Sequence, residues 1–233
     1  MTFDPANKST AIWSPDGSRI VFNSNRTGAV RDLYQKSSNG AGTEEVLLAD
    51  SQDKWPVSWS SDGRFILYFR FDATTDWDLW VLPLVGDRKP FPFVQTRFSE
   101  WPGRFSPDGR WIAYRSPESG RDEVYVAPFP GPGGKRQIST AGGHHPRWRR
   151  DGKEIFYVAP SNKLMAATVN GQGSAFEVGE VRPLFDVRPA AGAGPRYFYD
   201  VSPDGQRFLV NTDLQAAAPP FNLVVNWTSA LKK

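Results

Sequence analysis

Short apolar runs separated by turn residues are the dominant pattern of this chain. Each run holds three or four large, β-prone residues and begins two or three positions after an Asp-Gly pair. Runs of this length between turn signals are typical of β-strands. The pattern predicts strands at residues 20–22, 65–68, 111–114, 155–157 and 208–210.

The Asp-Gly pairs define an internal repeat. Their aspartates stand at positions 16, 62, 108, 151 and 204, so the spacings are 46, 46, 43 and 53 residues. Proline sets φ at the first corner of a turn and glycine supplies a left-handed corner, so Trp-Ser-Pro-Asp-Gly predicts a hairpin turn held by the aspartate side chain. A large apolar residue stands three positions before each aspartate: Trp13, Trp59, Phe105, Trp148 and Val201.

Two further short strands are expected in most repeats. A third strand is predicted at 32–34, 78–80, 123–125, 163–165 and 222–224, and a fourth at 45–48, 92–94, 137–139 and 182–185. Pro92 and Pro183 lie in fourth strands, which suits an edge strand because a missing N–H costs no ladder bond there. Acidic residues recur at the start of the third strand and are expected to form hydrogen bonds within or between repeats: Asp32, Asp78 and Glu123.

Four antiparallel strands in every 40-odd residues predict a β-propeller blade. The expected fold is all-β, a single domain over residues 1–233 with five four-stranded antiparallel blades. The repeats run approximately over 8–50, 51–96, 97–140, 141–187 and 188–233. Residues 1–4 are expected to close the ring by adding the outermost strand of the fifth blade. The aromatic residues that precede the turns are expected to pack blade against blade.

Composition narrows the possible chemistry. The 233 residues include no Cys, which excludes disulfides, a thiol nucleophile and any Cys-ligated metal. A net charge of +3 gives little reason to expect nucleic acid as a partner. No apolar run is long enough to cross a bilayer, and the first residues lack the pattern of a signal peptide. Neither a Gly-x-Ser-x-Gly motif nor Walker spacing occurs.

The repeated Trp-Ser-Pro-Asp-Gly motif with its following strand resembles the TolB-like propellers, relatives of the WD-repeat proteins. Segments 87–93, 128–135 and 147–154 and the terminal Asn226-Trp227 are similar to the C-terminal propeller of bacterial serine/threonine protein kinases. In those proteins the propeller lies outside the membrane, although no kinase motif occurs here. The resemblance implies a sensor or docking propeller. The propeller would be extracytoplasmic as part of a membrane-anchored parent chain. It would be cytoplasmic if the chain is expressed with this sequence alone.

Position within the repeat points to one mouth of the central channel, where propellers commonly bind ligands. The residues seven positions before the turn aspartates are Ser9, Trp55, Trp101, His144 and Tyr197. Pseudo-symmetry therefore predicts a ring of the last four around the mouth, with Arg196 beside it. Such a ring could stack on an aromatic or acyl group, or take an apolar side chain from a partner. The alternative for the two tryptophans is packing between blades.

A hydrolase of esters or phosphoesters at the same mouth is the alternative function. His144 or His145 could act as a base near neutrality, aided by Glu100, Asp200 or a divalent metal that these four residues hold. Adjacent strand residues point to opposite faces, so both histidines could bind one metal only if glycines 142–143 keep them in a loop. Otherwise they form an exposed loop pair or contact a ligand.

The favoured interpretation is a non-catalytic, monomeric binding propeller. Its partner would be a protein, a peptide or a small molecule at the channel mouth, and it would need no cofactor. The sequence leaves open whether the chain has any enzymatic activity.

Overall fold

Every regular element in the described part of the computed structural model is a β-strand, as the short apolar runs predict. The structure describes residues 6–131, 133–173, 175–190 and 198–213. The first sheet comprises β1 (Lys8–Trp13), β2 (Arg19–Ser24), β3 (Asp32–Ser37) and β4 (Glu45–Leu48). The second comprises β5 (Lys54–Trp59), β6 (Phe65–Asp72), β7 (Asp76–Pro83) and β8 (Phe91–Val94).

The later sheets follow the same plan. The third comprises β9 (Gly103–Phe105), β10 (Trp111–Ser116), β11 (Glu123–Pro128) and β12 (Arg136–Gln137). The fourth comprises β13 (His144–Trp148), β14 (Glu154–Val158), β15 (Lys163–Asn170) and β16 (Glu177–Asp186). The fifth is described for β17 (Tyr199–Val201) and β18 (Phe208–Val210). None of the elements in the described ranges is a helix long and apolar enough to span a membrane.

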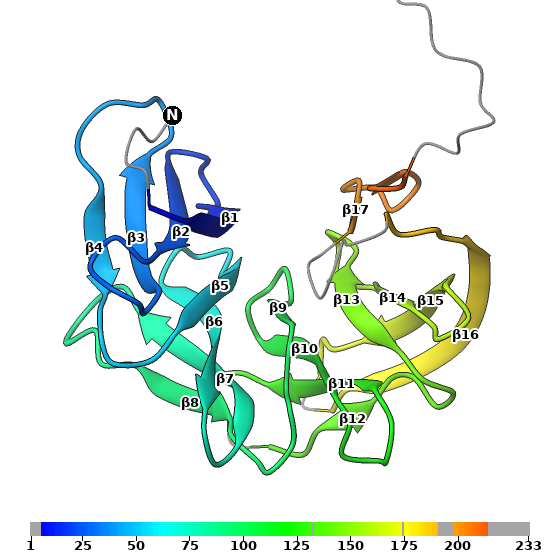
Figure 1. Ribbon diagram of the computed structural model, residues 1–233. Coiled ribbons are helices and arrows are strands. Elements are labelled where there is room, and N and C mark those ends of the chain that lie inside the picture. The colour runs from blue at the N-terminus through cyan, green and yellow to red at the C-terminus, as the bar shows by residue number, and fades with distance from the viewer. Residues whose placement is uncertain (1–5, 132, 174, 191–197, 214–233) are drawn as a thin grey trace, which may run out of the picture.

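The sheets follow one another along an arc in chain order (Figure 1). Strands within each sheet pair antiparallel with their sequence neighbours, as in a propeller blade. β1 contacts β5, β5 contacts β9, and β9 contacts β13, so the first strands line the inside of the arc. The fourth strands form its outer edges, which confirms the edge positions predicted from Pro92 and Pro183.

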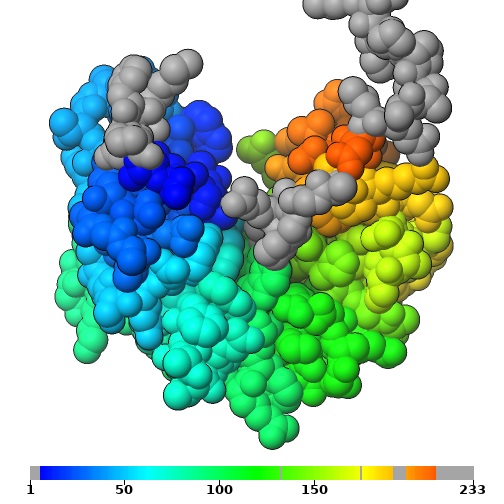
Figure 2. Space-filling view, viewed as in Figure 1, coloured from blue at the N-terminus to red at the C-terminus, as the bar shows by residue number. Residues whose placement is uncertain are grey.

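Closure of the ring stays a prediction. The expected third strand at 222–224 and the closing segment 1–4 lie outside the described residues. Among the described strands, none pairs the first sheet with the fifth. The space-filling view shows the first four sheets packed side by side around the arc (Figure 2).

In the second, third and fourth sheets, the aromatic residue before the turn packs its sheet against the preceding one. Trp59 lies in a buried cluster with residues of the first sheet, and Phe105 in one with residues of the second. The indole N–H of Trp148 donates to the carbonyl oxygen of Arg104 at 3.2 Å. These contacts confirm the expected packing between blades. Trp13 differs, with 60% of its surface exposed, because it lies in the first sheet, which follows no other sheet along the described arc.

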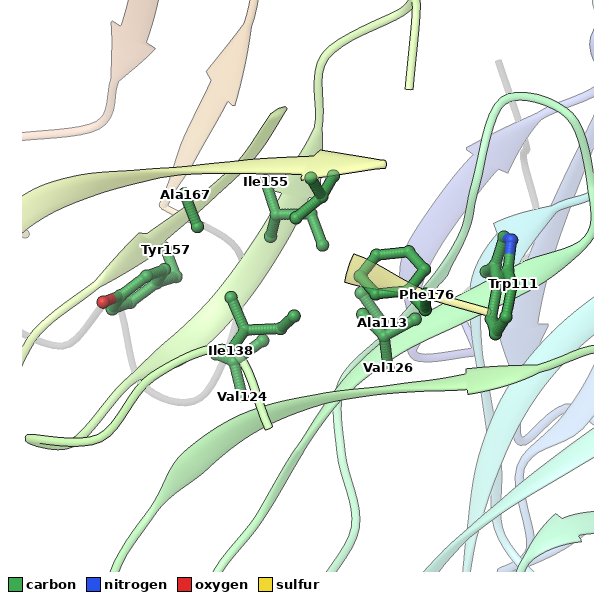
Figure 3. Packing of buried hydrophobic residues seen from close by; sticks show 10 residues of the cluster. Trp111, Ala113, Val124, Val126, Ile138, Ile155, Tyr157, Ala167 and Phe176 are labelled. Atoms are coloured by element: carbon green, nitrogen blue, oxygen red, sulfur yellow. The ribbon is translucent and has the colours of Figure 1, made fainter. Parts of the chain in front are cut away.

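One buried cluster joins the third and fourth sheets (Figure 3). Trp111 of β10 is 6% exposed and meets Phe176 edge to face, with the ring centroids 4.9 Å apart. Its indole N–H donates to the carbonyl oxygen of Gly171 at 3.0 Å. Aliphatic residues such as Val124 and Ile155 fill the rest of the interface. Flat rings and branched side chains thus occupy the wedge between two twisted sheets.

A serine and an aspartate side chain hold the predicted turns. The Ser14 hydroxyl donates to Asp16 Oδ1 at 2.6 Å, and the same oxygen accepts the Ser18 N–H at 3.0 Å. The Ser14 hydroxyl also accepts the N–H of Arg19 at 2.9 Å. Equivalent serine–aspartate bonds recur at Asp62, Asp108 and Asp204. The turn glycines have φ between 70° and 75°, so the predicted turn chemistry is confirmed.

Acid should weaken these turns. The hydroxyl of Ser14 and the N–H of Ser18 lower the pKa of Asp16 to about 2. A pKa below the unfolded value of about 3.9 means that the stabilisation is present above that pH and is lost as pH falls toward 2. We expect the difference in melting temperature between the wild type and Asp16→Asn to shrink between pH 4 and pH 2. A difference that stays constant over this interval, or an equal change in Asp87→Asn outside the repeated turns, would contradict the prediction.

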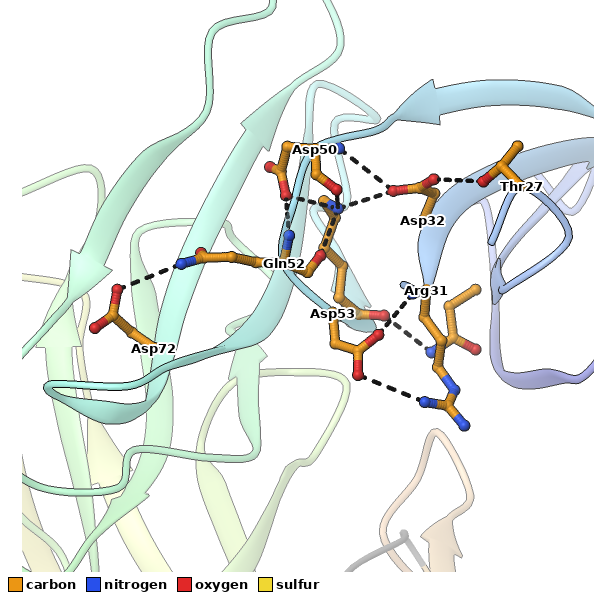
Figure 4. A network of polar contacts seen from close by, with 9 residues as sticks. Thr27, Arg31, Asp32, Asp50, Gln52, Asp53 and Asp72 are labelled. Atoms are coloured by element: carbon orange, nitrogen blue, oxygen red, sulfur yellow. Dashed lines mark hydrogen bonds and ion pairs between the residues drawn. The ribbon is translucent and has the colours of Figure 1, made fainter. Parts of the chain in front are cut away.

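The acidic residue that begins the third strand is buried, and it forms hydrogen bonds within and between sheets, as expected. Asp32 accepts from the ammonium group of Lys54 at 3.0 Å, and Lys54 is fully buried. Figure 4 shows Asp32 bonded also to the Thr27 hydroxyl and to the backbone of Asp50. In the third sheet, Glu123 accepts from Arg121 at 2.8 Å. The Asp32–Lys54 contact thus links the first blade to the second.

Candidate functional site

A cavity of about 790 Å³ lies inside the arc, against the first strands. Its wall includes Trp55 and Trp101, two of the residues predicted to ring the mouth, together with Ser9. Tyr197 and Arg196, the other predicted residues of the fifth repeat, lie outside the described residues. Two of the four predicted ring residues therefore border a concave surface, whose wall also includes Arg147 and Asp200 of later blades.

The two tryptophans belong to a larger aromatic cluster. Trp55 stacks on Phe69 with the ring centroids 5.3 Å apart and meets Trp77 edge to face at 4.7 Å. Phe69 also contacts Trp101 at 5.9 Å, so one continuous cluster spans the second and third blades. All four side chains are only partly buried and line the cavity. Trp55 and Trp101 thus pack against other aromatic side chains and also line the cavity.

Sequence reasoning missed Phe69 and Trp77. They lie on β6 and β7, whereas the repeat argument considered only residues that precede the first strand. Phe69 is the direct cross-strand partner of Trp55, and Phe71 is that of Trp77. Counting the strand register outward from Trp55 would have found Phe69, because directly paired residues share a face of the sheet.

Irregular pairing recurs where the first strands reach the mouth. The register shifts between Ser9 and Ile12 in β1 and between Pro56 and Ser58 in β5. It shifts again between His144 and Arg147 in β13. A bulge of this kind bends a strand and redirects its side chains, and bulges often accompany functional sites. Here the irregularity occurs in the first strand of three blades, β1, β5 and β13.

The histidine pair has a geometry that strand alternation did not predict. His145 has a left-handed backbone with φ of 55°, which brings its ring against that of His144, with the centroids 4.7 Å apart. His145 is 7% exposed and contacts Trp101 at 6.5 Å and Phe198 at 5.3 Å. Burial lowers the pKa of His144, so this imidazole is held toward its neutral form. The pair is therefore packed behind the aromatic cluster and is not an exposed loop.

The structure does not gather the predicted catalytic or metal-binding set. Glu100 is fully buried and accepts from the hydroxyls of Thr96 at 2.5 Å and Ser116 at 3.3 Å. The Asp200 carboxylate is 68% exposed and lies 3.5 Å from Arg147. Within the described ranges, no three His, Asp or Glu side chains lie together as metal ligands would. Among the described residues, neither Glu100 nor Asp200 therefore completes a three-ligand group with the histidine pair.

Positively charged side chains also line the cavity. Arg104 and Arg147 occupy the same position in adjacent repeats, four residues before the turn aspartate, and both face the cavity. Arg147 donates to the carbonyl oxygen of Tyr199 at 3.1 Å, and Arg104 donates to that of Val57. They line a second cavity of about 280 Å³ as well, so they stand where the two hollows meet.

Comparison with known proteins identifies the fold. No protein-family model matches the chain, and no curated protein does. A protein assigned as TolB from Agrobacterium tumefaciens is 19% identical with a TM-score of 0.62, over 79% of this chain and 68% of that one. TolB from Acinetobacter baumannii is 20% identical with a TM-score of 0.61, over 86% of this chain and 47% of that one.

An oligogalacturonate lyase in complex with manganese is 12% identical with a TM-score of 0.53, over 88% of this chain and 70% of that one. The chain therefore has the fold of the TolB-like β-propellers, and it spans about half the length of the Acinetobacter protein. The likeness to kinase propellers is not tested by these structures. Fold alone does not assign a function, because propellers with the same architecture host unrelated activities.

Proposed function

We propose that this chain is a non-catalytic binding propeller whose ligand site is the channel mouth around Trp55 and Trp101. The observation that carries the proposal is the partly exposed aromatic cluster in the wall of the cavity of about 790 Å³. Ligand sites are commonly concave and apolar, with a few placed polar groups. The partner would be a protein, a peptide or a small molecule that places an apolar or aromatic group on this cluster.

The cavity wall also favours a negative group on the same ligand. Arg31, Arg104 and Arg147 line the wall together with Asp200, and Arg31 and Arg147 lie 3.5 Å from Asp53 and Asp200, respectively. Arg31 lies over the Trp55 ring with its guanidinium carbon 5.7 Å from the ring centroid, at the aromatic end of the cavity. A guanidinium fork matches carboxylate geometry, so a ligand with both an aromatic and a carboxylate group would use both parts of the wall.

Removing one tryptophan of the mouth should weaken binding and leave the fold intact. A panel of short acidic peptides and aromatic carboxylates, screened by thermal shift, supplies ligands whose dissociation constants are then measured calorimetrically. We expect Trp55→Ala and Trp101→Ala to raise the dissociation constant tenfold or more, because aromatic anchors of this kind typically contribute about 1–3 kcal/mol. Phe185→Ala, a 41% exposed aromatic on the outer strand β16, is the matched control and should bind as the wild type does. Dissociation constants unchanged in both tryptophan variants would refute the proposed site.

The hydrolase hypothesis makes a different prediction at the same place. The neutral imidazole of His144 could accept a proton, but Glu100 is bonded to hydroxyls, and among the described residues no third ligand joins the histidine pair. A panel of chromogenic esters and phosphoesters separates the two functions. Turnover that is lost in His144→Ala or His145→Ala would favour the hydrolase, whereas no turnover, or turnover unaffected by both changes, would exclude it.

A further inference from the structure

The acidic residue buried at each blade interface receives a different partner in each repeat. Between the first and second blades, Asp32 meets the Lys54 ammonium group. Between the third and fourth, Glu123 receives the guanidinium of Arg121 and the N–H of Gly142 at 2.9 Å. Both interfaces therefore supply a positive charge from the chain itself, as a buried carboxylate requires.

The interface between the second and third blades lacks this compensation. Asp78, fully buried, accepts at Oδ2 from the Thr75 hydroxyl at 2.6 Å and the Gln95 amide at 3.1 Å, both neutral groups. Glu100 stands in the place of Lys54, since each lies eight residues before its turn aspartate. The backbone confirms the equivalence: the Glu100 N–H donates to Trp77 O at 2.6 Å, as that of Lys54 does to Arg31 O at 3.0 Å.

Two buried acids thus occupy the positions that hold an ion pair at the preceding interface, and the charge of Asp78 acts on Glu100. The Oδ1 atom of Asp78 and the Oε2 atom of Glu100 are both buried and have no hydrogen-bond partner in the described structure. Burial raises the pKa of each, and the charge of Asp78 raises that of Glu100 further, to about 6. Glu100 thus brings a second buried carboxyl group to the place where Lys54 brings a cation at the preceding interface.

Neighbouring charges do not balance the pair. Asp72 acts on Asp78, and Glu118 acts on Glu100, each adding negative potential. Arg70 is the cation acting on Asp78, and its guanidinium lies over the Trp80 ring, 3.5 Å from the centroid. Lys135 pairs with Glu118, so these two cations offset part of the negative charge.

We propose that Asp78 and Glu100 form a binding site for a divalent cation of the calcium class, which takes the place of the Lys54 ammonium group between the second and third blades. Two carboxylates neutralise one divalent charge, and carboxylate and hydroxyl oxygens are the ligands that calcium prefers. Hydroxyls of Thr75, Thr96 and Ser116 already surround the two carboxylates. Because only two acids contribute, we expect a dissociation constant on the order of 10⁻⁴–10⁻³ M, as in extracellular calcium modules.

The test is the melting temperature of the full chain at pH 7.5 and constant ionic strength. Raising calcium from zero, with chelator, to 10 mM should raise the wild-type melting temperature by about 3–6 °C, by binding to the folded state alone. Magnesium, which demands stricter octahedral geometry, should give a smaller rise. Asp78→Asn should lose most of the calcium response.

Glu100→Lys recreates the ion pair of the preceding interface and is the most informative variant. We expect it to melt without calcium at or above the temperature of the calcium-loaded wild type, and to show no calcium response. A wild type indifferent to calcium, or an equal response in Glu100→Lys, would overturn the proposal. So would a wild type that ignores calcium but melts higher as pH falls from 8 to 5, since a shared proton would then satisfy the pair. If Glu100→Lys does not fold, Glu100→Gln serves, with loss of the calcium response expected.

Discussion

Replacing Lys54 by Ala should destabilise the protein by about 3–5 kcal/mol, the cost of breaking a buried ion pair by removing one partner. The Lys54 ammonium group is fully buried and lies 3.0 Å from Asp32, 2.8 Å from Asp50 and 2.6 Å from the carbonyl oxygen of Gln52. Without it, Asp32 would remain as an uncompensated charge between the first and second blades. Urea denaturation of wild type and variant measures the change in unfolding free energy.

An exposed ion pair provides the control for Lys54. Lys163 and Asp186 pair on the fourth sheet with side chains 38% and 68% exposed, and solvent screens such a pair. Lys163→Ala should therefore change the unfolding free energy by no more than about 1 kcal/mol. Equal effects of the two lysine substitutions would show that the Lys54 network does not stabilise the blade interface.

Trp111→Ala should cost about 3–5 kcal/mol through the cavity left between the third and fourth blades. The indole loses its contact with Phe176, its bond to Gly171 and its packing against the interface cluster. Trp111→Phe keeps a ring but loses the donor, so we expect a smaller loss. The two variants are compared by urea denaturation, and a loss below about 1 kcal/mol for Trp111→Ala would contradict the packing described here.

The repeat made the fold predictable to a high degree. An Asp-Gly turn followed by an apolar strand specifies one hairpin per repeat, and the glycines adopt the left-handed φ that this turn needs. The ends of the outer strands were harder to predict from the sequence. The strand predicted at 137–139 is observed as β12 (Arg136–Gln137), and the one predicted at 182–185 extends over Glu177–Asp186. Edge strands pair on one side alone, so local sequence limits their ends less strictly.

The candidate site was predictable only where the backbone follows the repeat. Trp55 and Trp101 line the cavity as pseudo-symmetry predicts. Glu100 does not belong to that surface, because the position eight residues before the turn aspartate points between blades and is buried, as Lys54 also is. The packing of His145 against His144 was not predictable, because the left-handed backbone of His145 breaks the alternation of side chains along a strand.

The central claim is that the mouth around Trp55 and Trp101 binds the ligand. Fluorine NMR of protein labelled with 5-fluorotryptophan tests it directly, with resonances assigned by single Trp→Phe substitutions. Titration with an aromatic carboxylate that the thermal-shift screen identifies should shift the Trp55 and Trp101 signals and leave that of Trp111, buried in another interface, in place. A saturable shift at Trp111 with none at Trp55 or Trp101 would contradict the claim.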